Sequence, residues 1–202
     1  MTNFDKDSFS LKGKVALITG GAEGLGRNYS IALSMYGADI FIVSRTQNGW
    51  DEIRQIITDN GQQAGFLKMD ITEVGAAEKI VQSVIDQFGH LDILVNNAGM
   101  QIRNDVLAFE DADWQKVINL NLNALYYLSH EAAKVMTKQK SGKIINIGSM
   151  QSYRAGKFIF PYTASKHAVL GLTKAYADAL APYNIQVNGL APGYIKTNMT
   201  KA

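Results

Sequence analysis

The chain has 202 residues, 47% of them hydrophobic, and a formal net charge of +2, with Lys and Arg scattered along the sequence. This composition favours a single compact domain, residues 1–202, and offers no basic cluster of the kind that binds nucleic acid. The absence of cysteine excludes disulfides and thiolate metal sites. No apolar run approaches the ~20 residues of a membrane span, and the start of the chain lacks the apolar core of a signal peptide, so we expect a cytoplasmic protein.

Six short apolar segments predict β-strands, and most are apolar throughout, as expected of strands that are buried on both faces. They cover residues 14–20, 39–45, 64–70, 91–99, 143–149 and 185–191. Segments with helical periodicity lie between them, at about 25–37, 50–59, 73–88, 112–139 and 162–182. This alternation predicts an α/β fold with a doubly wound parallel sheet and helices on both faces. Ligands bind such sheets beyond the carboxyl ends of the strands, so the residues there are candidate site residues.

The first predicted strand leads into a glycine-rich turn, TGGAEGLGRN. Thr19, Gly20, Gly24 and Gly26 give the pattern T-G-x-x-x-G-x-G. Glycines let the backbone turn tightly and approach a pyrophosphate, which binds at the positive N-terminus of the next helix. Such turns also occur without a ligand, but this position after the first strand of an alternating fold favours a dinucleotide-binding loop.

The end of the second predicted strand bears on which dinucleotide binds. Ser44 and Arg45 stand where an acidic residue would contact the ribose 2′-hydroxyl of NAD, whereas an Arg suits the 2′-phosphate of NADP. Arg45 therefore favours NADP. Glu23, inside the glycine loop, favours NAD because its carboxylate would repel that phosphate. The alternative for Arg45 is an ordinary solvated loop residue, and the choice between NAD and NADP stays open.

Polar and small residues also follow the third and fourth predicted strands. Asp70 either caps the following helix or hydrogen-bonds to the adenine edge of a dinucleotide. In the motif N-N-A-G, the amides of Asn96 and Asn97 are expected to brace the loop. Ala98 and Gly99 give tight packing or leave room for a cofactor ribose.

The helical segment 112–139 contains three asparagines among apolar residues, although Asn is a middling-to-poor helix former. Asn121 is best placed to act at the site, provided the helix bends there and frees a backbone carbonyl for a water molecule. His130 and His167 are interpreted as ordinary surface or helix residues. No group of His, Asp or Glu has the spacing of a metal site.

Ser149 ends the fifth predicted strand, and Tyr162 and Lys166 follow it at the start of a helix that Pro161 helps to begin. A spacing of four residues places Tyr162 and Lys166 on one face of that helix. A tyrosine is a poor base at neutral pH, but an ammonium nearby favours the phenolate and lowers its pKa. Ser149 is placed to orient a substrate oxygen. Small residues are expected to form the core-facing stripe of this helix, away from the pair: Ala164, Ala168, Leu172, Ala175 and Ala179.

As a set, these motifs resemble those of the classical short-chain dehydrogenase/reductase family. The glycine loop, N-N-A-G, Asn121, Ser149, Y-x-x-x-K and a final P-G at 192–193 occur in the family's order, and the resemblance extends from about residue 11 onward. It implies a Rossmann-type oxidoreductase in which Tyr162 is the general acid/base and Lys166 lowers its pKa and binds the ribose. Ser149 is then the carbonyl anchor and Asn121 the proton relay. The implied cofactor-binding residues are Gly20, Glu23, Gly24, Leu25, Gly26, Ser44, Arg45, Asp70, Ile71, Asn97, Ala98, Gly99, Tyr162, Lys166, Ile195 and Thr197.

Within that family the chain is most similar to 2-deoxygluconate 3-dehydrogenases and gluconate 5-dehydrogenases, which implies a sugar acid as the small-molecule substrate. Arg103 then becomes a candidate to bind the substrate carboxylate, with Ser149 and Gln151 as further substrate contacts. Arg154 and Lys157 are additional candidate cations. The alternative for each cation is a solvated loop residue.

Two other functions are compatible with the same residues. One is the reduction of a 3-oxoacyl thioester or another carbonyl compound. The other is dinucleotide binding without turnover, because members of the family continue beyond the position of Ala202 with a substrate lid, a helix and a final strand. The resemblance also implies a homo-oligomer, a dimer or tetramer, through the helices at 112–139 and 162–182.

Overall fold

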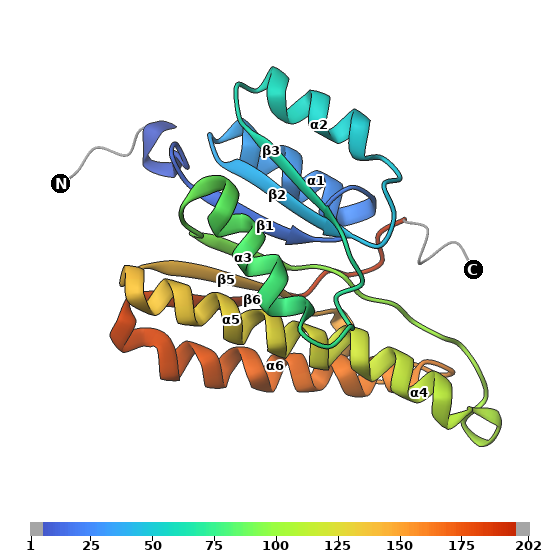
Figure 1. The fold of residues 1–202 in the computed structure, drawn as a ribbon. Coiled ribbons are helices and arrows are strands. Elements are labelled where there is room, and N and C mark those ends of the chain that lie inside the picture. The colour runs from blue at the N-terminus through green and yellow to red at the C-terminus, as the bar shows by residue number, and fades with distance from the viewer. Residues whose placement is uncertain (1–5, 197–202) are drawn as a thin grey trace.

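The computed structural model describes residues 6–196, an α/β fold built on a six-stranded sheet (Figure 1). The strands are β1 (Val15–Thr19), β2 (Asp39–Ser44), β3 (Ala64–Lys68), β4 (Ile93–Asn96), β5 (Gly142–Ile147) and β6 (Ile185–Leu190). All neighbouring strands pair in parallel, in the order β3-β2-β1-β4-β5-β6. The predicted doubly wound parallel sheet is confirmed.

The predicted helices are present, with one interruption. They are α1 (Gly24–Met35), α2 (Trp50–Asp59), α3 (Ala76–Phe88), α4 (Asp111–Ile118), α5 (Ala124–Gln139) and α6 (Phe160–Leu180). The segment 112–139 is two helices instead of one, because a π-helical turn, Asn119–Asn123, separates α4 from α5. Among the described residues, no helix is both long and apolar enough to cross a membrane.

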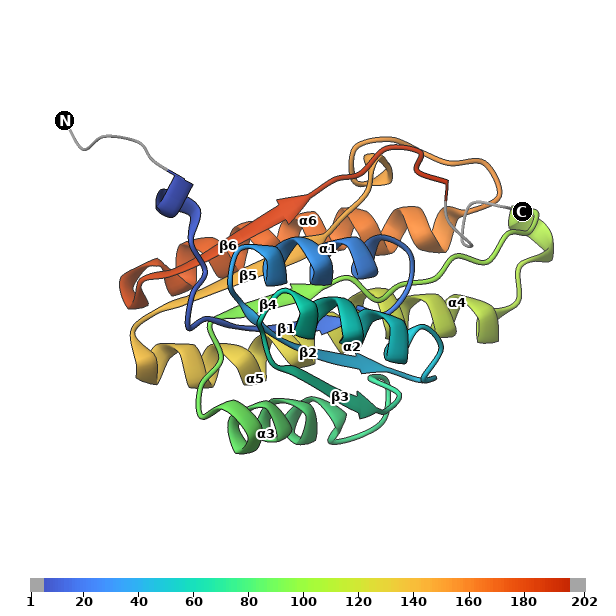
Figure 2. The ribbon, with the colours of Figure 1, turned by 90° about the horizontal axis from the view of Figure 1, so that it is seen from above.

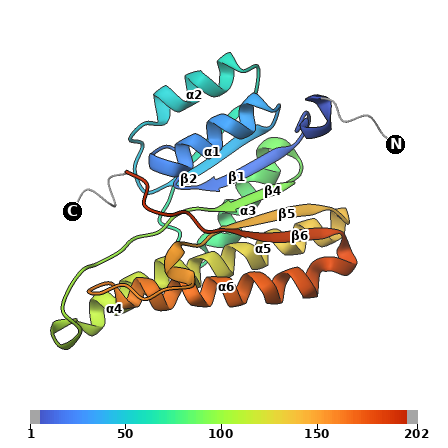
Figure 3. The ribbon, with the colours of Figure 1, turned by 180° about the vertical axis from the view of Figure 1, so that it is seen from behind.

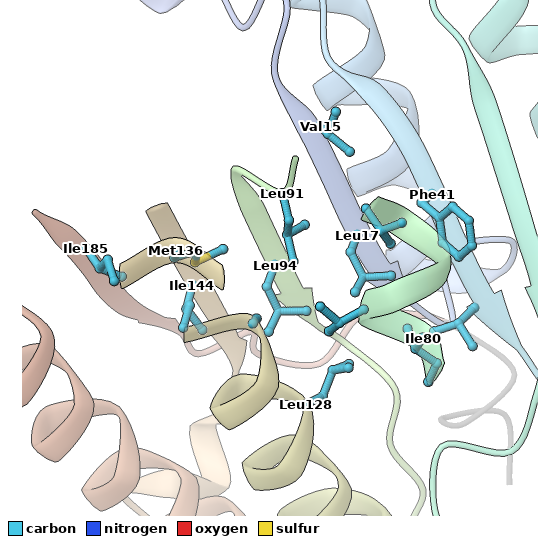
Figure 4. Close-up of a cluster of buried hydrophobic side chains, with 14 of the residues drawn as sticks. Val15, Leu17, Phe41, Ile80, Leu91, Leu94, Leu128, Met136, Ile144 and Ile185 are labelled. Carbon is cyan, nitrogen blue, oxygen red and sulfur yellow. The ribbon is translucent and has the colours of Figure 1, made fainter. Parts of the chain in front are cut away.

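The helices cover both faces of the sheet: α1 and α2 lie on one face, and α3, α5 and α6 lie on the other (Figure 2). Side chains alternate along each central strand, so each face has its own apolar core. Ile18, Ile40 and Ile42 pack toward α1 and α2. Leu17 and Leu94 belong to the second core, shown in Figure 4, which α3 and α5 cover.

The winding of the chain reverses between β1 and β4, which are neighbours in the sheet although β2 and β3 lie between them in the sequence. The loops that follow β1 and β4 therefore leave in opposite directions. A crevice opens between them at the carboxyl ends of the strands, which is where doubly wound sheets bind their ligands.

Helix α6 does not bury the stripe that the sequence predicted. Ala164, Ala175 and Ala179 are exposed, and Ala168 and Leu172 are only partly buried. The buried face is largely polar. Its hydroxyl and ammonium groups can be buried because they find hydrogen-bond partners on the sheet and on neighbouring turns. Its members are Pro161, Ser165, Lys166, Val169 and Thr173.

Candidate active site

A cleft of about 400 Å³ opens at the carboxyl ends of β1 to β5, at the point where the winding reverses. The loops after these strands, the start of α6 and the segment after β6 form its walls. The predicted cofactor-binding residues that line it are Gly20, Glu23, Gly24, Leu25, Ser44, Arg45, Asp70, Ile71, Asn97, Ala98, Gly99, Tyr162, Lys166 and Ile195. The lining also includes Ser149, the apolar residues Val43, Met69, Leu120 and Ile147, and Gly148, Pro192 and Gly193.

The turn between β1 and α1 forms one wall of the cleft. Gly20 and Gly24 have φ angles of 64° and 56°, which favour glycine. A Cβ on Gly26 would lie 2.2 Å from the carbonyl oxygen of Gly20, far inside van der Waals contact. Helix α1 begins after Glu23, whose side chain makes no capping hydrogen bond. The first N–H groups of α1 and its dipole are therefore available to an anionic group in the cleft.

Asn97 braces this turn from the end of β4. Its Nδ2 donates hydrogen bonds to the carbonyls of Thr19, at 2.9 Å, and Gly20, at 3.3 Å. In return, the hydroxyl of Thr19 accepts hydrogen bonds from the backbone N–H groups of Asn97 and Ala98, at 2.9 and 2.8 Å. The predicted bracing role of N-N-A-G is thus confirmed for Asn97. Its partner hydroxyl, Thr19, carried no separate role in the sequence motif.

Arg45 and Asp70 line the cleft at the ends of β2 and β3. Burial raises the pKa of Asp70, but hydrogen bonds from Thr72 and the charge of Arg45 outweigh it and hold that pKa below its ordinary value. One carboxylate oxygen of Asp70 accepts the N–H and the hydroxyl of Thr72, at 2.9 and 2.7 Å. The interpretation of Asp70 as a helix cap is wrong, because α3 starts only at Ala76 and follows Gly75. Its contact with adenine stays a prediction.

Asn121 is fully buried in the π-helical turn. Its amide exchanges two hydrogen bonds with the backbone of Met100, both of 2.9 Å. Its Nδ2 also donates to the hydroxyl of Ser165 at 3.1 Å, and that hydroxyl donates to the carbonyl of Tyr162 at 2.7 Å. The expected departure from α-helical geometry at Asn121 is present. Asn121 connects the loop after β4 to the first turn of α6, and Ser165, which sequence reasoning missed, completes the connection.

Ser149, Tyr162 and Lys166 meet in the cleft at the end of β5. The side chain of Ser149 is near enough to Tyr162 to act on its pKa, which it lowers. Lys166 is only 4% exposed, and its Nζ donates to the carbonyl of Ile147 at 2.6 Å. The same Nζ lies 5.6 Å from the centre of the Tyr162 ring. The fold therefore brings together the three groups that the sequence pattern singled out, and it adds a backbone acceptor that no sequence motif could indicate.

The lowering of the Tyr162 pKa by Lys166 stays a prediction, and in the chain by itself burial has the largest effect on that pKa. Burial raises the pKa of Tyr162 above its ordinary value of 10.0, and the side chain of Ser149 opposes this rise only in part. The Nζ of Lys166 is bonded to Ile147 instead of the phenol oxygen, and burial lowers the pKa of Lys166 from 10.5 to about 8. Tyr162 is therefore a phenol at neutral pH.

Lys166 also makes the stability of the chain depend on pH. Between its folded pKa of about 8 and its ordinary value of 10.5, the unfolded chain binds more protons, so the free energy of unfolding rises with pH. The two pKa values differ by the equivalent of about 3 kcal/mol. Between pH 8 and 10.5, we expect wild type to gain about 3 kcal/mol of unfolding free energy relative to Lys166→Met, which lacks the titrating group. Urea denaturation across this range measures it, and a constant difference would contradict the lowered pKa.

The predicted substrate contacts other than Ser149 lie around the cleft. Arg103 is exposed in the loop after β4 and is not part of the cleft lining that the described residues form. Gln151 is buried in the short turn after Ser149, and its backbone N–H donates to the Ser149 hydroxyl at 3.1 Å. Their roles toward a substrate stay predictions. Thr197, a predicted cofactor contact, lies outside the described residues.

Two long loops meet beside the N-terminal end of α6, as Figure 3 shows. The N–H of Asn104, in the loop after β4, donates to the carbonyl of Phe158 at 3.0 Å. Arg154 and Lys157 are exposed in the loop that contains Phe158. The candidate substrate-binding cations Arg103, Arg154 and Lys157 therefore lie in loops that contact each other.

A model of the short chain dehydrogenase family matches residues 14–202. The protein is a short-chain dehydrogenase. It is 50% identical, over 98% of this chain, to the uncharacterized oxidoreductase YgcW of Escherichia coli K12. It is 44% identical, over 96% of this chain, to the 2-dehydro-3-deoxy-D-gluconate 5-dehydrogenase of Bacillus subtilis 168, and it spans 76% of each of these relatives.

The solved structures that this short-chain dehydrogenase resembles include a gluconate 5-dehydrogenase from Burkholderia cenocepacia J2315 in complex with NADP and tartrate. The two superpose with a TM-score of 0.90 at 38% identity, over 96% of this chain and 76% of that one. The family predicted from the motifs is confirmed, and the protein is an NAD(P)-dependent oxidoreductase that acts on CH–OH groups.

The residues of this short-chain dehydrogenase fit a nicotinamide dinucleotide. The uncapped start of α1 suits a pyrophosphate, and the close approach of Gly26 to Gly20 keeps the turn narrow. The same cleft contains Arg45 at the end of β2 and Tyr162 at the start of α6. Its walls thus offer a cation for the ribose end and a proton donor for the reacting end.

Proposed function

We propose that this short-chain dehydrogenase interconverts a secondary alcohol and a ketone on a sugar acid of the gluconate or deoxygluconate type. The observation that carries the proposal is that Ser149, Tyr162 and the buried Lys166 line one cleft, with the Nζ of Lys166 5.6 Å from the centre of the Tyr162 ring. The sugar-acid substrate is supported by the relatives named for 2-dehydro-3-deoxy-D-gluconate and for gluconate. A carboxylate on the substrate would suit Arg103.

The proposed roles follow from what each side chain holds. Bound NAD(P) would supply or accept the hydride. In reduction Tyr162 gives the proton of its hydroxyl to the ketone oxygen. In oxidation its own proton first leaves to solvent through the relay, and the phenolate then takes the proton of the alcohol. Ser149 orients the substrate oxygen next to Tyr162. Lys166 is cationic below its pKa of about 8 and favours the charged phenolate as it forms.

Asn121 is the proposed relay residue in this scheme. Its side chain is committed to Met100 and Ser165, so the relay would use a water molecule at a backbone carbonyl of the π-helical turn. Proton return to solvent from Lys166 would pass through that water. The irregular turn supports this role, because a π turn displaces carbonyls from α-helical hydrogen bonding.

We propose NADP as the preferred cofactor. Arg45 supports this preference, because a guanidinium at the end of β2 suits the 2′-phosphate, whereas Glu23 in the same cleft opposes it. We expect Arg45→Ala to weaken NADPH binding by roughly tenfold to a hundredfold and to leave NADH binding unchanged, since a hydrogen bond to a charged group contributes about 1.5–3 kcal/mol. Fluorescence titration of both dinucleotides measures this change.

Lys68→Ala is the matched control for the cofactor prediction. Lys68 is an exposed cation at the end of β3 and is not among the described residues that line the cleft. This variant should bind both dinucleotides as wild type does. An equal loss of NADPH and NADH affinity in Arg45→Ala would show that Arg45 does not read the phosphate.

The experiment that tests the function is a substrate panel. Gluconate, its keto and deoxy derivatives, 3-oxoacyl thioesters and simple ketones are each mixed with NAD(H) or NADP(H), and nicotinamide absorbance is followed. Turnover confined to sugar acids is the expected result. Turnover of 3-oxoacyl thioesters would favour the carbonyl-reductase alternative, and clear dinucleotide binding without any turnover would favour the binding-protein alternative.

We further propose that residues 1–202 act as one dinucleotide-binding unit that associates into a dimer or tetramer. Exposed aromatic residues on α5 and in the turn after α6 support self-association: Tyr126, Tyr127 and Tyr183. Light scattering coupled to size exclusion tests it, and a strictly monomeric mass would refute it. A cytoplasmic location stays a prediction from the sequence.

A further inference from the structure

Helix α6 packs on the sheet with polar as well as apolar side chains. The face that α3 buries is apolar throughout and consists of Ala76, Ile80, Val81 and Val84. The buried face of α6 instead includes Ser165, Lys166 and Thr173 among its five residues. Each of these three polar side chains has a hydrogen-bond partner outside α6: Asn121 for Ser165, the carbonyl of Ile147 for Lys166 and Asn146 for Thr173. Hydrogen bonds have preferred directions and distances, whereas apolar contacts do not, so these bonds restrict where α6 can lie.

The hydrogen bond between Asn146 and Thr173 belongs to a buried network of side-chain hydrogen bonds. The Nδ2 of Asn96, on β4, donates to the Oδ1 of Asn146, on β5, at 2.9 Å and to the hydroxyl of Ser129, on α5, at 2.8 Å. The Nδ2 of Asn146 donates to the hydroxyl of Thr173 at 2.9 Å, and that hydroxyl donates to the carbonyl of Val169 at 2.7 Å. The four side chains that these hydrogen bonds connect are at most 7% exposed. We call Asn96, Asn146, Ser129 and Thr173 the amide network.

The amide network and Lys166 hold α6 to consecutive residues of one strand. Lys166 donates to the carbonyl of Ile147, and Asn146, the residue before it on β5, donates to Thr173. Lys166 and Thr173 are seven residues apart, about two helical turns, and so share one face of α6. Two anchor points on one face fix both the rotation of α6 and its position along β5. The same strand leads into Ser149 two residues after Ile147.

We infer that the Asn146–Thr173 hydrogen bond is a positioning contact, which sets α6 on β5 so that Tyr162 lies opposite Ser149. The inference rests on the proposed function, in which Tyr162 and Ser149 act on the same substrate oxygen. Neither Asn146 nor Thr173 lines the cleft among the described residues, so they act through Tyr162 and not on the substrate. A small displacement of α6 would separate the reacting groups without emptying the cofactor cleft.

Thr173→Val tests the inference, because valine has the shape of threonine but lacks the hydroxyl. We expect kcat to fall by about tenfold to a hundredfold, since a displacement of about 1 Å costs up to about a hundredfold in rate. KM and the Kd of NADPH should stay within about twofold of wild type, because the cleft lining is intact. Thr173→Ser, which restores the hydroxyl, should recover most of kcat.

Ser129→Ala is the matched control, because it removes a hydroxyl from the same amide network on α5, which carries neither Tyr162 nor Lys166. It should lower stability to urea as Thr173→Val does, yet keep kcat. Equal losses of kcat in Ser129→Ala and Thr173→Val, or a wild-type kcat in Thr173→Val, would overturn the inference. If Thr173→Val kept the wild-type kcat while Tyr162→Phe was inactive, the inference would fail but the proposed function would still stand.

Hydrogen exchange gives a readout that does not need turnover, so the inference is testable even if no substrate is found and the proposed function fails. Thr173→Val should speed exchange of α6 amides more than that of α3 amides, while Ser129→Ala should not single out α6. Uniformly faster exchange across the chain, or no change in α6, would overturn the inference.

Discussion

The Tyr162→Phe variant is expected to fold and to bind NADPH but to lose turnover by roughly 10²–10⁴-fold, the usual contribution of a general acid or base. The substitution removes only the hydroxyl, which is the proposed proton carrier in the cleft that Ser149 also lines. The ring stays in place beside the Nζ of Lys166. Because the change removes at most one hydrogen-bonding hydroxyl and leaves the ring, the free energy of unfolding should fall by no more than about 1 kcal/mol.

Three measurements on Tyr162→Phe separate chemistry from folding. Nicotinamide absorbance gives kcat, fluorescence titration gives the Kd of NADPH, and urea denaturation gives stability. Tyr36→Phe is the control, since Tyr36 is 54% exposed at the end of α1 that is remote from the glycine turn, and it should match wild type in all three. Undiminished turnover in Tyr162→Phe would refute the proposed mechanism.

The Gly26→Ala variant should lose both stability and dinucleotide binding. Its new methyl group would lie 2.2 Å from the carbonyl oxygen of Gly20 and 2.6 Å from the Nδ2 of Asn97, and both are parts of the braced turn. The turn must open to admit it, which we expect to cost roughly 1–3 kcal/mol of unfolding free energy, the range for overpacked sites. The opened turn should no longer hold a pyrophosphate against the start of α1, so NADPH affinity should fall by more than about tenfold.

Gly171→Ala is the matched control for this prediction. Gly171 lies in α6, and a Cβ there would meet no atom within 4 Å. Alanine favours helix over glycine by up to about 1 kcal/mol, so this variant should be slightly more stable than wild type and should bind NADPH equally well. If Gly26→Ala behaved like Gly171→Ala in urea denaturation and NADPH titration, the narrow turn would not be what shapes the phosphate end of the cleft.

Much of the fold and of the site was predictable because the signals are local. Apolar runs, most of them continuous, marked the six described strands, and glycines marked the turn after β1. A spacing of four residues sufficed to put Tyr162 and Lys166 on one helical face. The order of alternating elements then implied that Ser149 and this pair would meet at one edge of a parallel sheet.

The predictions that failed depended on contacts between distant segments. The stripe of small residues on α6 had helical spacing, but spacing alone could not tell whether the sheet lies on that side. Asp70 had the residue type of a cap, yet its carboxylate is held by Thr72 before α3 begins. Burial also raises the pKa of Tyr162, an effect that the spacing of residues along the chain could not indicate.

By itself, the sequence determined the α/β architecture, the glycine turn and the identity of the groups that meet in the cleft, because residue type and spacing along the chain specify these features. Only the tertiary structure decided how those groups are held. Lys166 bonds to the carbonyl of Ile147, and Thr173 bonds to Asn146, 27 residues away. Burial and hydrogen-bond partners arise when distant segments pack, so they set ionisation and alignment in ways that no local pattern encodes.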